Sequence, residues 1–184
     1  VAHMMGPHDV SRITQPPILA LGVRLVHEVS PAPDWVAALY PKLCAYVEWD
    51  LAHRDSDGAG LVEWAIEGDP HCRSGESGMD NSPRFDSATQ LDAVDFNAFL
   101  AHECEILGDF ADETGRPDEA RRWRERHARL CDLMNQRLWS SEAGFYVDYD
   151  VEKQAHSPVL ASSGFLPLLC GAPDAARAAR LAAH

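Results

Sequence analysis

The sequence predicts an all-α fold in which helices pair as antiparallel hairpins. Apolar residues recur at helical spacing in long segments, prolines stand in the first turns of these segments, and short polar turns join the segments in pairs. The 184 residues are 46% hydrophobic, which is enough apolar side chain for one sizeable core. Three successive hairpins of this kind indicate an α/α architecture.

The first hairpin is predicted to begin at Thr14, with two prolines in the first turn of its helix. The apolar stripe of that helix is Ile18, Leu21, Leu25 and Val29. A second helix is predicted from Asp34 to Ala52, with a break or kink at Pro41. Residues 1–13 then form an N-terminal extension, and residues 55–87 form a long loop dense in Gly, Asp, Ser and Pro. Loops of this length are usually functional or disordered.

The second hairpin is predicted to begin at Ser87, which forms a capping box with Gln90. Its first helix ends at Gly115, and Pro117 opens its second helix. The apolar stripes of the two helices include Leu91, Val94, Ala98, Ile106, Phe110, Ala120, Trp123, Leu130, Met134 and Leu138. The segment "GFYVDYD" follows, and its alternation predicts a small strand or an extended turn.

A third pair of helices is predicted over residues 158–169 and from Pro173 onward. The last segment, "PDAARAARLAAH", has no capping glycine or terminating proline, so we expect the chain to end inside a helix. A hairpin array that stops early leaves an apolar face without a neighbour. We therefore expect further helices, or a second chain, to cover that face.

Charge and cysteine usage restrict the partners of the protein. The net charge is -13, from 29 acids and 16 bases, so phosphate backbones and anionic membranes would be repelled on average. The five cysteines are odd in number and never spaced as CxxC, which is typical of free thiols in a reducing cytosol. We therefore expect a cytoplasmic protein that binds neither nucleic acid nor membrane.

The sequence resembles glycoside hydrolase family sixty-three over about residues 15–171. The motifs that carry the resemblance are "ITQPP", "RDSDGAGLVE", "ESGMDNSPRFD", "GFYVDYD" and "SSGFLPLLCG", in that order. They are most similar to the branch with mannosylglycerate and glucosylglycerate hydrolases and bacterial α-glucosidases. The resemblance implies an (α/α)6 barrel, of which residues 14–184 would form a catalytic-domain fragment of about half the barrel. It also implies an active site in the loops at one barrel end, including residues 55–87.

Glycoside hydrolysis by inversion requires a carboxylic acid that protonates the leaving oxygen and a carboxylate that activates water. The resemblance assigns the general acid to Asp80, with Asn81 and Arg84 as orienting or substrate-binding residues. From the residues alone, Asp80 and Asn81 fit equally well a turn whose side chains cap backbone groups. Glu76 is too close in the chain to be the second carboxylate. We expect it to bind a backbone amide or to shape the loop, and we also count it among the candidate substrate-binding residues. The resemblance places the base after the matched region.

Other sequence features concern substrate and metal. The resemblance suggests that Gln15 hydrogen-bonds the group joined to the sugar, although a first-turn helix residue without a ligand fits as well. Asp55, Asp57 and Glu63 resemble a calcium loop, and Ala59 stands where another oxygen ligand would help. An Asx-rich turn without calcium is the alternative. No organic cofactor is expected.

The preferred interpretation is an inverting glycosidase that acts on an α-linked glucoside or mannoside with a small aglycone. Two alternatives stay open: another α/α-barrel carbohydrate enzyme, such as a phosphorylase, or a non-catalytic helical carbohydrate-binding or scaffold fragment. Two departures from the family bear on this choice. Gly75 replaces a tryptophan that commonly precedes the motif, and the family's aromatic-rich N-terminal motif is not found. Both would contact the sugar, so substrate choice is not fixed by the resemblance.

Overall fold

A computed structural model describes residues 13–67 and 71–184 of the protein. The N-terminal extension lies outside the described residues except for Ile13. The larger helices are α1 (Leu19–Val29), α2 (Pro33–His53), α3 (Val94–Glu113), α4 (Pro117–Leu133) and α5 (Ala175–Leu181). The short helical turns are η1 (Pro83–Phe85), η2 (Met134–Leu138) and η3 (Ser162–Leu168). This mostly helical structure confirms the all-α prediction.

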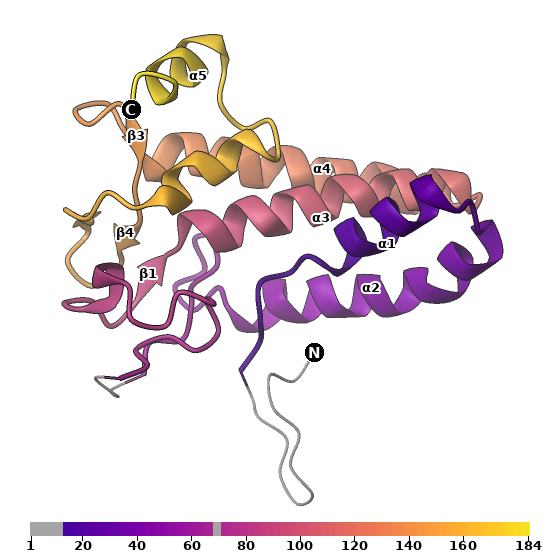
Figure 1. The fold of residues 1–184 in the computed structure, drawn as a ribbon, viewed down its shortest axis with the longest axis horizontal. Coiled ribbons are helices and arrows are strands. Elements are labelled where there is room, and N and C mark those ends of the chain that lie inside the picture. Colours follow the sequence, from indigo (N-terminus) through magenta and orange to yellow (C-terminus); the bar gives the residue numbers. More distant parts are fainter. Residues whose placement is uncertain (1–12, 68–70) are drawn as a thin grey trace, which may run out of the picture.

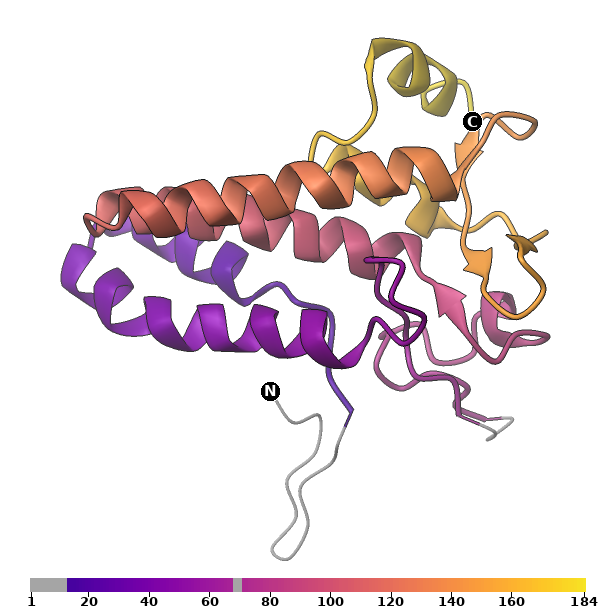
Figure 2. The same ribbon diagram turned by 180° about the vertical axis from the view of Figure 1, so that it is seen from behind.

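Two antiparallel hairpins, α1 with α2 and α3 with α4, form the body of the fold (Figure 1). Helix α3 is central, because it contacts α1, α2, α4 and η3. The turns of both hairpins lie at one end of the molecule, and the long loop and the strands gather at the other (Figures 1 and 2). No helix among the described residues is both long and apolar enough to cross a bilayer.

Five short strands reinforce the loop-bearing end. Strand β4 (Tyr149–Asp150) pairs antiparallel with β1 (Leu91–Asp92) and with β5 (Ala155–His156). Strand β2 (Trp139–Ser140) pairs with β3 (Phe145–Tyr146). The "GFYVDYD" segment therefore contributes one strand to each of two small sheets, which links the segment after α4 to the segment before α3.

Several predicted helix boundaries are wrong, including the expected end of the chain inside a helix, because α5 ends at Leu181. The first helix begins at Leu19, so its two prolines precede the helix. Helix α3 begins at Val94, because Leu91 and Asp92 pair with β4 and the Gln90 side chain donates to Glu63 at 3.2 Å instead of closing a capping box. In the third pair, the first member is only a short 3-10 turn that contains Pro167. The corrections to these last three segments reflect a proline or a long-range partner that overrides local periodicity.

The core is organised around α3, whose buried residues lie on all sides of the helix. Trp64 of the long loop stacks on Phe96 with ring centroids 3.8 Å apart. By contrast, most of the predicted apolar stripe of α1 is exposed: Leu25 is 55% exposed and Val29 is 87% exposed, while the buried residues of the helix are Ala20 and Val23. The core of the described chain therefore leaves one apolar helix face uncovered.

A buried carboxylate of α3 caps the start of α1. Glu103 is 1% exposed, and its two oxygens accept the amide N–H groups of Ala20 at 2.7 Å and Leu21 at 2.8 Å. These donors belong to the first turn of α1, where the helix offers no partner of its own. Burial raises the pKa of the Glu103 carboxyl to about 7, although the two amide bonds lower it in part. Glu103 therefore joins the two hairpins through hydrogen bonds from the first turn of α1 to its buried carboxyl group.

We expect Glu103→Gln to flatten the pH dependence of stability. The raised folded-state pKa means that the folded protein holds this proton more tightly than the unfolded chain, so stability falls as pH rises from about 4.5 to about 7. The wild type should lose up to about 3 kcal/mol more unfolding free energy across this window than Glu103→Gln. Urea denaturation at several pH values measures the difference.

The exposed Glu125→Gln variant is the control and should retain the wild-type slope. Glu103→Ala, which leaves both α1 amides without an acceptor, should lower the unfolding free energy by about 2 to 4 kcal/mol. Equal pH slopes for the wild type and Glu103→Gln would contradict the assignment of a raised pKa to Glu103.

Candidate active site

The loop that carries Asp80 is held by its own backbone. The amide N–H groups of Arg73 and Ser74 donate to the Asp80 carbonyl at 2.8 and 3.3 Å. Gly78 has a φ of 68°, in the left-handed region that glycine adopts without a steric penalty. The side chain of Asp80 is exposed. The loop backbone is therefore fixed, while the carboxyl group that the resemblance assigns as general acid remains accessible.

Glu76 is a buried clamp within the same loop. Its carboxylate is 0% exposed and accepts the amide N–H groups of Thr14 at 2.8 Å and Ala65 at 2.9 Å. Arg54 completes the clamp with an Nε hydrogen bond at 3.2 Å and an ion pair through Nη2. The structure thus corrects the assignment of Glu76 to substrate binding. It instead fits the alternative in which Glu76 binds backbone amides and shapes the loop, because both of its oxygens already accept hydrogen bonds from the chain itself.

Arg84 is buried between two carboxylates. Its guanidinium donates to Asp95 at 2.6 and 3.0 Å and to Asp148 at 2.6 and 2.8 Å, and its side chain is 0% exposed. The two bidentate contacts use the planar fork that distinguishes arginine from lysine. Arg84 therefore neither binds substrate nor orients Asp80 by direct contact, which corrects both expectations. It joins η1 to the start of α3 and to the segment before β4.

The surroundings of this ion pair satisfy its remaining acceptors. The Trp64 indole N–H donates to Asp95 at 2.9 Å, and the Val94 amide donates to Asp148 at 2.9 Å. Burial raises the pKa of the Asp148 carboxyl, and the Arg84 charge opposes that rise. Burial alone would lower the pKa of Arg84, but the two carboxylates more than offset this effect and the net pKa is raised. The guanidinium is therefore permanently charged.

Gln15 and Asn81 both lie near Asp80 in the fold. The amide bond from Thr14 to Glu76 brings the segment before α1 against the loop. A Cβ atom at Gly78 would lie 3.9 Å from Pro16, which shows how closely the two segments approach. The side chains of Gln15 and Asn81 are exposed, as is that of Asp80. The structure therefore gathers three of the predicted site residues at the loop-bearing end, with their roles still predictions.

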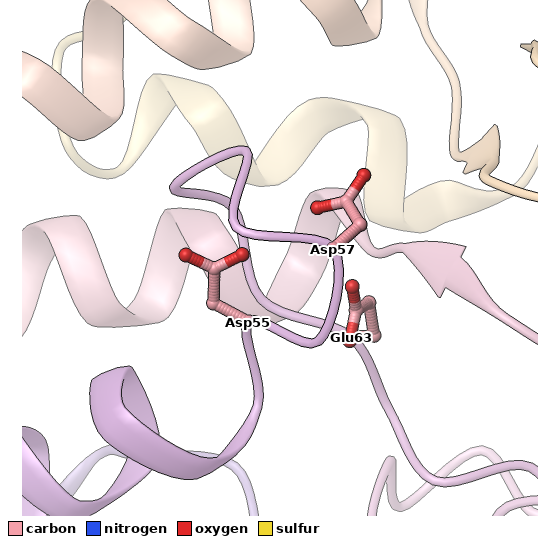
Figure 3. A group of neighbouring side chains, drawn as sticks. All are labelled: Asp55, Asp57 and Glu63. Atoms are coloured by element: carbon pink, nitrogen blue, oxygen red, sulfur yellow. The ribbon is translucent and has the colours of Figure 1, made fainter.

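The three acids of the predicted calcium loop come together, as Figure 3 shows. Asp55, Asp57 and Glu63 each offer a carboxylate oxygen, and these oxygens lie within 4.8 Å of one another. Some of these carboxylate oxygens already accept hydrogen bonds from backbone amides, because Gly60 donates to Asp55 at 3.0 Å and Ala59 donates to Asp57 at 2.9 Å. The loop thus has both converging oxygens and the Asx-type turns of the alternative interpretation. Calcium binding stays a prediction.

A fourth carboxylate and one arginine adjoin this loop. Asp92 forms an antiparallel bridge with Glu63 and is 0% exposed. Arg137 lies 2.6 Å from Asp92 and 2.9 Å from Asp57. Burial raises the pKa of the Asp92 carboxyl to about 7; Arg137 opposes the rise, and the three loop carboxylates add to it. The acid-rich loop is therefore neutralised in part by the chain's own cation.

The sequence interpretation missed the residues that position the site. They are Asp92, Asp95, Asn97, Arg137 and Asp148. Asn97 shows why: its amide bonds both the N–H and the carbonyl of Val62 at 2.9 Å, and so substitutes for a neighbouring strand. Nothing in the local sequence signals such a contact. Only Asp148 had a signal, because it lies in the acidic and aromatic "GFYVDYD" segment.

Comparisons with known proteins show similarity to glycoside hydrolases. The chain is 28% identical over 239 residues to the mannosylglycerate hydrolase of Thermus thermophilus, with 94% of this chain and 54% of that protein covered. It is 30% identical over 135 residues to rabbit (Oryctolagus cuniculus) trehalase, with 66% of this chain and 22% of that protein covered. A mannosylglycerate hydrolase of Selaginella moellendorffii is 36% identical over 93 residues, which cover 48% of this chain and 18% of that protein.

Solved structures extend the likeness to three dimensions. The mannosylglycerate hydrolase of Thermus thermophilus in complex with glucose matches with a TM-score of 0.80 and 29% identity, over 98% of this chain and 53% of that chain. A rhamnosidase of Bacillus shares only the fold, with a TM-score of 0.70 and 18% identity over 94% of this chain and 17% of that chain. These matches place the structure in the class of helical α/α domains found in glycoside hydrolases.

Within that class, the chain belongs to the family described as the mannosylglycerate hydrolase MGH1-like glycoside hydrolase domain, which matches residues 2–184. The resemblance to glycoside hydrolase family sixty-three is thereby confirmed. The chain spans about half the length of the Thermus relative, namely 54% of that protein.

We expect Arg84→Met to be strongly destabilising, because it leaves two buried carboxylates without a counter-charge. The unfolding free energy should fall by about 3 to 5 kcal/mol. Arg84→Lys should also destabilise, since one ammonium group cannot form two bidentate contacts. Urea denaturation monitored by tryptophan fluorescence measures both changes.

Arg124→Lys is the matched control, because Arg124 also contacts two aspartates but is 49% exposed. Its unfolding free energy should change by less than about 1 kcal/mol. An Arg84→Met protein as stable as the control would show that the buried ion pair does not hold the loop.

Proposed function

We propose that this chain forms part of an inverting glycoside hydrolase that cleaves an α-linked glucoside or mannoside with a small aglycone. The observation that carries the proposal is an exposed Asp80 on a loop that is fixed from both sides by buried ion pairs. The relatives support the substrate class, since they include mannosylglycerate hydrolases and trehalases. One related structure holds glucose and another holds Tris and D-glycerate.

In the proposed reaction, Asp80 is the general acid. Its carboxyl group protonates the glycosidic oxygen as the bond to the anomeric carbon breaks, and the aglycone leaves as an alcohol. A second carboxylate accepts a proton from the water that attacks the opposite face of the sugar. The products are the free sugar with inverted anomeric configuration and the aglycone alcohol. Gln15 and Asn81 would bind the substrate from either side of Asp80.

We propose that the second carboxylate belongs to a part of the enzyme outside residues 1–184. Glu76 is unsuitable because it is buried and its oxygens are occupied by three donor residues. The proposed chemistry requires no organic cofactor. We propose a cytosolic location, because the five cysteines are odd in number and never spaced as a CxxC pair.

We expect Asp80→Asn in the complete protein to lower kcat for α-glucosides and α-mannosides of glycerate by about 10²- to 10⁴-fold. Loss of a general acid matters most when the leaving group is a poor one. The same variant should therefore retain much more of the wild-type rate with α-glycosyl fluorides, whose leaving group needs little protonation. Release of free sugar measures both rates, and NMR of the first product tests inversion.

The matched control is Asp86→Asn, which removes an exposed acid from the same segment and should leave both rates near wild type. Near-wild-type rates for Asp80→Asn on all substrates would contradict the assignment of Asp80 as the general acid. Equal losses on glycosides and fluorides would point to a structural role instead. A requirement for inorganic phosphate would favour the phosphorylase alternative.

We further propose that the rest of a barrel, or a second chain, covers the open apolar faces of this structure. Two groups of large hydrophobic residues are exposed. At α1 they include Leu25, Val26 and Val29, together with Ile18 just before the helix, and around η3 they are Leu160, Phe165, Leu168 and Leu169. Faces of this size usually mark an interaction surface. The chain also covers only 53% of its Thermus structural neighbour, which leaves room for further helices.

We expect Val29→Ser in the complete protein to lower the unfolding free energy by about 1 to 2 kcal/mol, because a covered valine loses its burial. An uncovered Val29 would give a change within about 0.5 kcal/mol. Chemical denaturation measures this difference, and the adjacent exposed Glu28→Gln is the control. A neutral Val29→Ser would contradict the covered face.

A further inference from the structure

Arg137 joins three segments of the loop-bearing end. It lies in η2, just after α4, and its guanidinium reaches Asp57 at 2.9 Å through Nη2 and Asp92 at 2.6 Å through Nε. The guanidinium carbon also lies 4.4 Å from the centroid of the Tyr149 ring. The backbone carbonyl of Arg137 is bonded to the His156 ring at 2.8 Å. Both the side chain and the backbone of Arg137 are therefore held in place.

The position of Arg137 matters because of the charge around it. Asp55, Asp57 and Glu63 bring carboxylate oxygens within 4.8 Å of one another, and Asp92 adjoins them through its bridge to Glu63. Like charges at such distances repel strongly when partly shielded from water. Among the ion pairs of the described residues, those made by these four acids all go to Arg137. The four acids thus form a site for a cation, and the guanidinium of Arg137 already supplies that positive charge.

The hydrogen bonds of the loop fit a protein cation, the guanidinium of Arg137, better than a metal ion. Asp57 uses one oxygen for the Ala59 amide at 2.9 Å and the other for Arg137. The amides of Ser56 and Gly60 likewise donate to Glu63 and Asp55 at 3.1 and 3.0 Å. Ala59 itself offers no side-chain oxygen where a calcium loop commonly has one. The loop therefore keeps its shape through amide hydrogen bonds and one guanidinium.

We propose that Arg137 is the resident counter-ion of the cluster formed by Asp55, Asp57, Glu63 and Asp92, and that it occupies the role a calcium ion would otherwise fill. Two consequences follow. The wild-type protein is indifferent to calcium, and removal of the positive charge at position 137 converts the cluster into a calcium site. This inference is independent of the proposed hydrolase activity, because it concerns the charge balance of the loop alone.

The test compares thermal unfolding of the complete protein, stripped with EDTA, with and without about 1 mM CaCl2. The wild type and Arg137→Lys, which keeps the charge, should show the same Tm in both conditions. Arg137→Gln should have a lower Tm without calcium and should regain at least about 4 °C when calcium is added. The exposed Arg122→Gln is the matched control and should show no calcium response.

Terbium luminescence gives a second readout on the same proteins. Tyr149 lies beside Arg137 and can sensitise a bound lanthanide, so Arg137→Gln should gain an emission that calcium displaces. A calcium-dependent rise in the wild-type Tm would overturn the proposal, and so would an Arg137→Gln protein that binds neither ion. If Arg137→Gln does not fold in EDTA, its recovery on refolding with CaCl2 supports the proposal, and failure in both conditions overturns it.

Discussion

The structure depends first on the buried arrangement of Arg84 between Asp95 and Asp148. Four hydrogen bonds of 2.6 to 3.0 Å connect the long loop, the start of α3 and the segment before β4. Such a group is costly to bury, and it is tolerated only when every partner is satisfied. The Trp64 indole and the Val94 amide supply the remaining bonds. One ion pair thus fixes three segments that are distant in the sequence, and its loss would leave charges that water cannot reach.

A second clamp, Glu76, acts on the other side of Asp80. It ties the loop to the segment before α1 and to the end of α2. Between these clamps, Asp80 has a backbone carbonyl held by two amides and an exposed side chain. A reacting group is most effective when its support is rigid and its own atoms are free to meet substrate. Glu76 and Arg84, the buried charged residues of the motif, therefore provide the rigidity, and Asp80 stays accessible for the proposed chemistry.

The sequence predicted helices α2 and α4 well, because apolar periodicity is a local signal and so is Pro117 at the start of α4. It failed where a partner is distant in the chain. The start of α3 was placed at Ser87 on a capping pattern, whereas Gln90 binds Glu63 and the next residues pair with β4. Arg84 lies 64 positions from Asp148, so no spacing rule could assign it a structural role. Exposed residues such as Asp80 were found only through the resemblance to a family.

Three arginines explain how this acid-rich chain can bury several carboxylates. Arg54, Arg84 and Arg137 bind carboxylates that are almost wholly buried, in three separate places of the loop-bearing end. Burial would otherwise force these acids to take up protons or to unfold the loops that carry them. No ion pair of the described residues involves Asp80. Asp80 is therefore the acid of the "ESGMDNSPRFD" motif whose carboxyl group is exposed and makes no ion pair within the described residues, which is the accessibility that the proposed general acid requires.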